Sequence, residues 1–324
     1  MADIVLKKQG IVDLPKFFMK FIRKVPLAIS GLALGLASLG ILLQPHGEAI
    51  SFTLGAFSFL ILCAVFIKII FDLKRVKEEL KNPLVLSTLP TFTMALMLLC
   101  VYAKPYVGIP AVYLWYLAVA AQILIMLVFA KRFIVGLKLE TVFPSWFVVT
   151  VGIVTASVTS PAMDAKLLGQ MIFYAGFVLY FIVLSINIYR LIKLRELPEP
   201  AQPTLAIFTA PMSLCIVGYF AAFPQPNALF VYVMLFIAAV SYIFVSVKMF
   251  SLVRLKFYPS FAAFTFPYVI SAIAFELTNV FLVDNGYYFF SFMPIISKWI
   301  AIIVVAFVSV RYLQFLILPS PKAN

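Results

Sequence analysis

The most regular feature of the chain is a series of long apolar stretches separated by short polar segments. A helix needs roughly 20 apolar residues to cross about 30 Å of hydrocarbon, and ten stretches approach or exceed that length. They lie near 26–44, 50–72, 84–103, 110–130, 142–162, 165–189, 204–223, 227–250, 259–283 and 287–316. A membrane β-strand would instead alternate over about ten residues. The pattern predicts an all-α integral membrane protein with ten transmembrane helices.

The same pattern divides the chain into three parts. Residues 1–25 form an N-terminal segment, residues 26–316 the ten-helix transmembrane domain, and residues 317–324 a C-terminal tail. The stretch "FFMKFIRKVP" interleaves charges with aromatic residues, so it lacks the apolar core and the cleavage site of a secretory signal. We expect Leu14 to Lys24 to form a short helix that lies flat on the inner leaflet.

Composition and charge agree with a membrane protein and indicate its orientation. The chain is 65% hydrophobic and 11% charged, which excludes a pair of soluble domains. Apart from Lys104, Lys166 and Lys298, every Lys and Arg falls at a terminus or near a loop that follows an even-numbered helix. Positive charge stays on the cytoplasmic side, so both termini are predicted to be cytoplasmic in the plasma (inner) membrane. The net charge of +13 then reflects topology rather than nucleic-acid binding.

The residues that could carry metal or enzyme chemistry are scattered. Cys63, Cys100 and Cys215 fall in separate predicted helices, and His46 stands alone in the turn "QPHGE". A metal site or a membrane-embedded enzyme needs several such side chains together. We therefore expect no metal, no cofactor and no enzymatic activity.

Proline recurs at matched positions along the chain. Pro90 in "LSTLPTFTMAL", Pro211 in "IFTAPMSLCIVGY" and Pro267 in "AAFTFPYVISA" fall in the third, seventh and ninth helices. A proline inside a helix removes one hydrogen bond and bends the axis. These three are expected to release the carbonyls of Leu86, Ile207 and Ala263.

The remaining odd-numbered helices also contain flexible positions. The fifth has Pro144 near its start and Gly152 further in, and the first has Gly31 and Gly35 in "SGLALGLASLG". The chain therefore divides into five tandem helical hairpins, each pairing a broken odd helix with a plain even one. We expect the odd helices to form an inner ring around a central pore, because irregular backbone at membrane depth must face protein or a water-filled cavity. Kinks that serve only packing are the alternative.

Three motifs together resemble one family. "SGLALGLASLG" at 30–40, "TAPMSLC" at 209–215 and "FTFPY" at 264–268 are similar to motifs of the tellurite-resistance/dicarboxylate transporter family, which includes bacterial TehA and the plant slow anion channel. The resemblance implies a homotrimer whose subunits each carry a pore closed by a phenylalanine of the ninth helix. Phe266 matches that gate, and Pro267 would bend the helix beside it. The alternative is that Phe266 packs in the core.

Two positions depart from the family pattern. Ile29 and Ser30 stand where an aromatic pair usually precedes the first glycine, and Val149 replaces the usual proline in the middle of the fifth helix. Pore width and gating are expected to differ for these reasons.

The few charges at membrane depth bear on function. Glu276 lies about 10 Å from the outer end of the ninth helix, and Lys298 comes to a similar depth on the tenth. We expect a buried ion pair, the alternative being a direct role in anion or proton handling. A pore that is otherwise neutral favours a channel for small monovalent anions such as chloride or nitrate. The alternatives are a secondary transporter of dicarboxylates or oxyanions such as malate or tellurite, possibly proton-coupled, and a receptor or scaffold without transport. A transporter of dianions would be expected to place Arg or Lys at mid-membrane on an inner helix.

Overall fold

The computed structural model describes residue 19 and residues 21–318. The odd-numbered spans are each built from several helical pieces. They are η1 (Leu27–Ile29), α2 (Ser30–Leu43) and η2 (Gln44–His46); α5 (Pro83–Thr88) and α6 (Pro90–Val107); α8 (Trp146–Thr150), η5 (Val151–Ile153), α9 (Val154–Thr159) and η6 (Ser160–Met163); η7 (Glu199–Thr209) and α11 (Ala210–Ala222); and η8 (Pro259–Phe264) and α13 (Thr265–Asp284).

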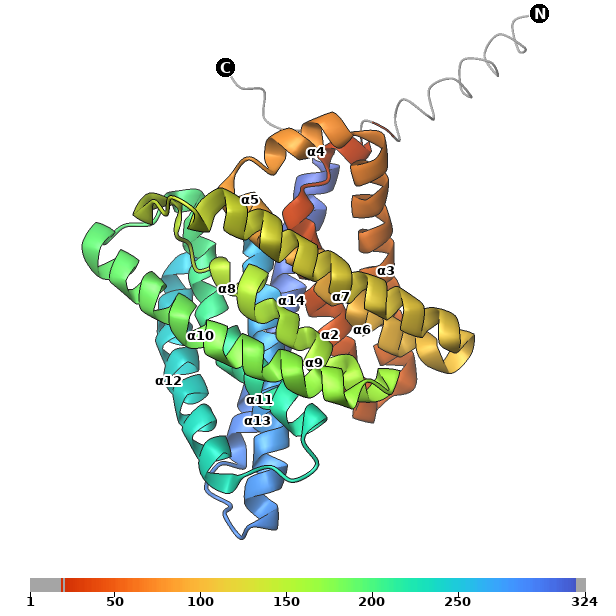
Figure 1. Cartoon of the computed structure of the whole chain (residues 1–324), viewed down its shortest axis with the longest axis vertical. Coiled ribbons are helices and arrows are strands. Elements are labelled where there is room, and N and C mark those ends of the chain that lie inside the picture. The colour runs from red at the N-terminus through yellow and green to blue at the C-terminus, as the bar shows by residue number, and fades with distance from the viewer. Residues whose placement is uncertain (1–18, 20, 319–324) are drawn as a thin grey trace, which may run out of the picture.

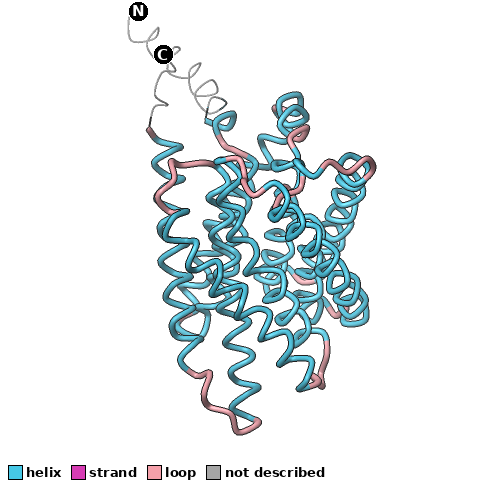
Figure 2. The backbone as a smooth tube through the Cα atoms, turned by 90° about the vertical axis from the view of Figure 1, so that its left-hand side faces the viewer, coloured by secondary structure: helices cyan, strands magenta, loops and turns pink. Residues whose placement is uncertain are grey.

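The even-numbered spans are continuous α-helices. They are α3 (Glu48–Phe71), α7 (Ile109–Phe129), α10 (Lys166–Leu194), α12 (Ala228–Leu252) and α14 (Phe292–Ile317). α7 continues into the π-helical turn η3 (Ala130–Ile134), and two short elements, α4 (Leu73–Glu79) and η4 (Leu139–Thr141), lie in loops. The ten spans confirm the predicted fold class, and Figure 2 shows a bundle of helices without strands in the described part of the chain.

The predicted terminal segments are described only in part. Of the helix expected over Leu14 to Lys24, residues 14–18 and 20 lie outside the described residues, while residues 19 and 21–24 are helical. Residues 319–324 of the predicted tail also lie outside them. The two described ends meet, because Lys24 Nζ donates to the carbonyls of Leu316 at 3.1 Å and Leu318 at 2.7 Å.

Burial separates the spans into an inner and an outer set. In the odd spans 61% to 78% of the most apolar stretch is buried inside the protein, whereas in the even spans the buried share is 28% to 33%. In Figure 1, α3 and α12 flank the inner helices and α7 and α10 cross in front of them. The predicted arrangement of odd helices inside and even helices outside is confirmed.

The inner helices form a closed ring in chain order. α2 contacts α6, α6 contacts α9, α9 contacts α11, α11 contacts α13, and α13 returns to α2. A side-chain hydroxyl links each neighbouring pair of spans. These links are Ser30 to Thr91, Ser87 to Ser145, Ser157 to the Gly218 carbonyl, Ser213 to Ser271, and Thr265 to the Gly31 carbonyl. Such hydrogen bonds and close backbone approach hold helices together in lipid, where hydrophobic driving force between helices is absent.

The first and last inner helices approach closely at two glycines. A Cβ at Gly35 would lie 2.5 Å from the Cβ of Thr265, and a Cβ at Gly31 would lie 3.0 Å from the Cβ of Ala262. The spacing of four residues places both glycines on the face of α2 that meets the ninth span, Gly31 against η8 and Gly35 against α13. The glycine motif of the first helix therefore closes the ring.

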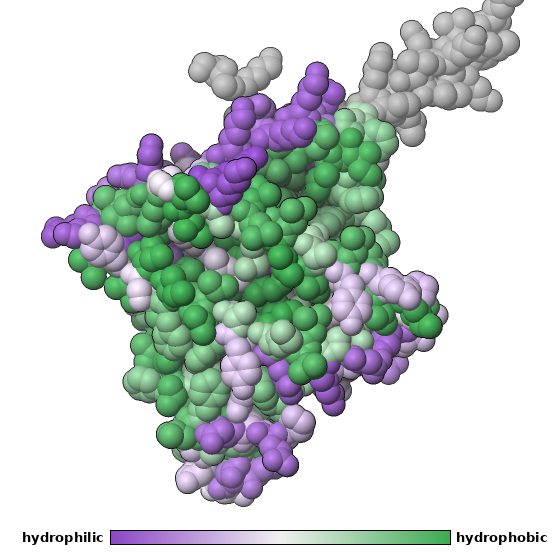
Figure 3. All heavy atoms as spheres, viewed as in Figure 1, coloured by the Kyte–Doolittle hydropathy of each residue, from purple (hydrophilic) through white to green (hydrophobic). Residues whose placement is uncertain are grey.

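The surface agrees with a membrane position. In Figure 3 hydrophobic residues cover the middle of the visible face, and hydrophilic residues gather toward its upper and lower ends. Large exposed apolar side chains such as Phe52, Leu124 and Phe236 belong to the even spans. This outer layer supplies the surface that lipid would cover.

Candidate functional site: an internal cavity at Phe266

A cavity lies within the ring of inner helices and occupies the half of the bundle where the odd spans begin. It holds about 620 Å³ of atom-free space, which includes some open solvent. All five odd spans contribute to its wall, and no even span does. The lining residues are Ala28, Gly31, Leu34, Thr88, Thr91, Met94, Phe147, Val148, Val151, Gly152, Thr204, Ile207, Ala210, Pro211, Leu214, Ser260, Ala262, Ala263, Phe266 and Pro267.

The lining positions recur at intervals of three residues. Residues 28, 31 and 34 line the cavity on the first span, 88, 91 and 94 on the third, and 260, 263 and 266 on the ninth. In a 3₁₀-helix residues three apart stand above one another, and 3₁₀ segments begin the first, seventh and ninth spans. Residues three apart also share a face of an α-helix, and the rows of these three spans combine 3₁₀ positions 28, 260 and 263 with α-helical positions 31, 34, 88, 91, 94 and 266.

The composition of the wall changes with depth. The first lining residues of three spans are Thr88, Thr204 and Ser260, whereas the deeper positions include Leu34 and Met94. Each of the three hydroxyls already donates its hydrogen to a backbone carbonyl. The polar entrance thus offers few free donors, and the deep end is apolar.

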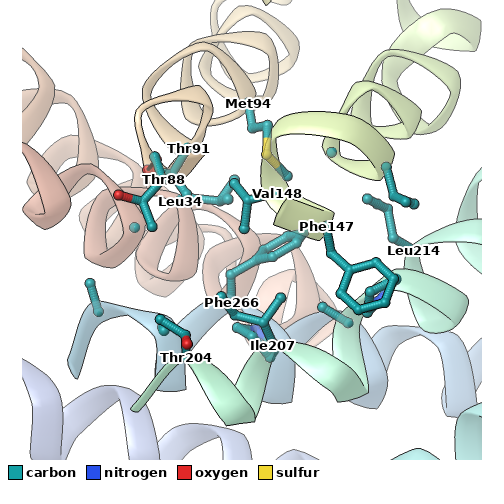
Figure 4. A pocket seen from close by; sticks show the side chains of 18 of the residues that line it. Leu34, Thr88, Thr91, Met94, Phe147, Val148, Thr204, Ile207, Leu214 and Phe266 are labelled. Carbon is teal, nitrogen blue, oxygen red and sulfur yellow. Dashed lines mark hydrogen bonds between the residues drawn. The ribbon is translucent and has the colours of Figure 1, made fainter. Parts of the chain in front are cut away.

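Phe266 stands at the deep end. In Figure 4 its ring points in among the labelled residues, near Val148 and Ile207. The residue is 7% exposed, whereas Phe264 is 0% exposed and packs its ring 5.0 Å from that of Phe261. Phe266 therefore borders empty space that Phe264 does not reach. The backbone explains the difference, because Phe264 ends the 3₁₀ segment η8 and Phe266 lies in the first turn of α13.

The residues predicted as pore-lining or as helix bends fall into two groups. Gly31, Gly152, Pro211 and Pro267 line the cavity beside Phe266. The others do not.

Gly35, Pro90 and Pro144 have other positions. Gly35 lies in the seam between α2 and α13, Pro90 is buried at the first residue of α6, and Pro144 is buried in the turn before α8. Val149, where the family usually has proline, is fully buried, and its neighbour Val148 faces the cavity.

The expected release of backbone carbonyls by proline is wrong for two of the three positions. The Leu86 carbonyl accepts the N–H of Leu89 at 3.3 Å, and the Ile207 carbonyl accepts the N–H of Ala210. Both are bonds to the residue three positions on, which the 3₁₀ turn supplies. The prolines lie in the first turn of an α-helix, where the missing N–H costs no helical bond. Pro90 and Pro211 therefore start α-helices after tight turns and do not expose these carbonyls by bending a continuous helix.

Glu276 and Lys298 lie together but outside the cavity wall. The Lys298 Nζ is 3.3 Å from the Glu276 Oε2, and the two side chains are 19% and 37% exposed respectively. The pair joins α13 to α14, so it links an inner helix to an outer one. Neither residue lines the cavity, and the pair is partly exposed rather than buried as expected.

The prediction from sequence did not include several residues of the cavity wall. Thr88, Thr204 and Ser260 at the entrance and Phe147 in the wall carry no distinctive motif among many similar residues. In the described residues no three His, Cys, Asp or Glu side chains lie close enough to hold a metal.

Ten membrane-spanning helices and an inner ring around a cavity without charged residues in its described wall fit the class of channels and channel-like transporters. The family comparison makes the assignment specific. The model of the voltage-dependent anion channel family matches residues 24–313, so the chain belongs to that family. A comparison with curated proteins gives no match.

Proposed function

We propose that the protein passes small monovalent anions, such as chloride or nitrate, through the cavity and that Phe266 gates the passage. The observation that carries the proposal is the composition of the wall. Among the described residues, every one that lines the cavity comes from an inner helix and none is charged, and the deep end holds the Phe266 ring. The family supports anion passage in general.

The uncharged wall also bears on the choice of substrate. A dicarboxylate or another dianion would need cationic side chains to replace its strong hydration, and the described wall supplies none. The hydroxyls at the entrance have their hydrogens engaged by backbone carbonyls. Weak binding and rapid passage of monovalent anions follow, with selectivity set by diameter and dehydration cost.

The arrangement around the gate supports control by the side chain itself. Phe266 borders the cavity, and the next residue is Pro267, which lies in the first turn of α13. The helix backbone beside the ring is therefore fixed, so opening would require the ring to turn or the inner helices to separate. An apolar ring across a narrow path blocks ions both by its size and by excluding water.

Assembly and orientation belong to the same proposal. We place the protein in the plasma (inner) membrane as a homotrimer with both termini cytoplasmic, on the strength of the family resemblance and the distribution of Lys and Arg. The cavity would then open toward the cytoplasm. Native mass spectrometry of the protein in detergent would test the trimer, and a trimer mass is expected.

Current measurements in planar bilayers test the function. With unequal potassium chloride on the two sides, the reversal potential of the Phe266→Ala variant should approach the equilibrium potential of chloride. A reversal potential near that of potassium would refute anion selectivity. Absence of current from the folded, inserted variant would refute the channel.

A further inference from the structure

The outer helix α3 buries a lysine close to its C-terminal end. The Lys68 side chain is 2% exposed, and α3 ends three residues later at Phe71. A buried ammonium group is costly unless acceptors replace the water that it loses. It carries three N–H donors, so the position of its acceptors shows what the lysine holds together.

The Lys68 ammonium joins two separate segments of the chain. Its Nζ donates to the Val25 carbonyl at 2.7 Å and to the two carboxylate oxygens of Glu79 at 2.8 Å and 3.1 Å. Val25 lies two residues before η1, where the first inner span begins, and Glu79 is the last residue of α4. One buried cation therefore ties the start of the first inner span to α4.

The helix α4 is itself held against the bundle. Val76 of α4 is 3% exposed and belongs to the main hydrophobic core. The Leu80 carbonyl, directly after α4, accepts a hydrogen bond from the Arg132 Nη1 at 3.2 Å. In Figure 1, α4 lies between the ends of α3 and α5. It forms a short strap at the end of the bundle where the odd spans begin.

The two residues before Val25 are fixed as well. The Arg23 Nε is 3.5 Å from the Oδ2 of Asp72, which stands between α3 and α4. The Lys24 Nζ donates to the carbonyls of Leu316 and Leu318 at the end of α14. Three consecutive residues thus bind the α3–α4 junction, the end of α14 and the buried lysine. The chain is anchored at three points immediately before the first inner span.

The first inner span supports the backbone of the gate. A Cβ at Gly35 would lie 3.2 Å from the Phe266 nitrogen, so α2 packs directly against the first turn of α13. The Thr265 hydroxyl also donates to the Gly31 carbonyl at 2.9 Å. η1 leads straight into α2, which is one continuous α-helix. A shift at the start of this span would therefore move the surface on which the Phe266 segment rests.

We propose that Lys68 and the α4 strap hold the first inner span against α13 and so keep the passage closed. This inference rests on the proposed role of Phe266 as the gate. Neither Lys68 nor Glu79 lines the cavity, so Lys68 is a positioning residue that acts through the first span. Release of Val25 would let that span move away from α13 and give the Phe266 ring room to turn.

The test is anion current through reconstituted protein with Phe266 intact, normalised to the amount of folded, inserted protein. Lys68→Met combined with Glu79→Gln removes the bond to Val25 and both charges together, which avoids an unpaired buried charge. This double variant should raise the current about 3-fold to 30-fold over wild type, within the range of coupling measured between separate positions. In the Phe266→Ala background the same two changes should add little, because the ring that they release is already absent.

Three comparisons make the test specific. Lys81→Met with Glu78→Gln removes an ion pair of 2.7 Å from the same loop, whose two side chains are both 68% exposed, and should leave the current unchanged. Lys68→Arg keeps a cation with several donors and should keep the current near that of wild type. Glu79→Gln alone should lower the thermal unfolding temperature more than the double variant does, because it leaves the buried Lys68 without its counter-charge.

The outcomes separate the strap from the channel. No anion current from Phe266→Ala overturns the channel itself. With that current present, an unchanged current in the folded double variant overturns only the role of the strap. An equal rise in the wild-type and Phe266→Ala backgrounds also overturns it, as does the same rise in Lys68→Arg or in the control pair. If neither the double variant nor Lys68→Arg folds, Lys68 is structural and the inference is wrong.

Discussion

Truncation of Phe266 to Ala should open the passage. In the structure the ring projects among side chains such as Val148 and Ile207 at the deep end of the cavity. For an ion to pass, the ring must move and crowd those neighbours. Crowding a packed site costs about 1–3 kcal/mol, and about 1.4 kcal/mol corresponds to a factor of ten in rate. Removing the ring should therefore raise anion current by about 5-fold to 150-fold. Easier entry of water into the path would add to this rise.

The assay is bilayer recording of reconstituted protein, with the amount of folded protein measured for each variant. Phe266→Leu should give a smaller rise, because leucine still fills part of the path. Phe264→Ala is the matched control. It removes a ring that is 0% exposed and packs on Phe261, so it should lower stability by about 3–5 kcal/mol with little effect on current.

Phe266→Ala should lower stability less than Phe264→Ala, because the Phe266 ring borders a cavity and contacts fewer atoms. Three results would refute the reasoning. They are an unchanged current in folded Phe266→Ala, an equal rise in Phe264→Ala, and a loss of stability in Phe266→Ala as large as that in Phe264→Ala. Any of them would return Phe266 to a role in core packing.

Three further predictions concern the packing of the bundle. Gly35→Ala should lower the thermal unfolding temperature, because the new Cβ would stand 2.5 Å from atoms of α13; an unchanged temperature would contradict the seam. Neutralising either Glu276 or Lys298 should lower that temperature more than neutralising both, since a single change leaves one charge unpaired, and equal or additive losses would argue against the pair. The Lys104 ammonium lies 2.6 Å from the carboxylate of Asp164 and, by hydrogen bond and charge, lowers the pKa of Asp164. The stabilisation that this lowered pKa provides is complete above the unfolded pKa of about 3.9 and is lost as the pH falls through the folded pKa. Wild type and Asp164→Asn should therefore unfold at different temperatures at pH 7, and the two temperatures should converge in strong acid.

The sequence by itself determined the class, the number of spans and the two-layer arrangement. Apolar length fixes how many helices cross a membrane, and Pro90, Pro211 and Pro267 mark the odd helices because irregular backbone must be shielded from lipid. These signals are local in the chain, so they can be read without coordinates. The same is true of the pairing expected from the depths of Glu276 and Lys298, which the structure places 3.3 Å apart.

Only the tertiary structure decided which residues meet at the cavity. Residues three apart share a face in both α- and 3₁₀-helices, so the spacing alone does not show which face of each inner helix points inward. Gly35 faces a neighbouring helix and Gly152 faces the cavity, although both are glycines of inner spans. The approach of the Gln122 amide to Gly152 joins residues from different hairpins, and the Met94 sulfur packs against the same glycine. Such contacts depend on how five hairpins close into a ring, and spacing along one helix carries no information about that closure.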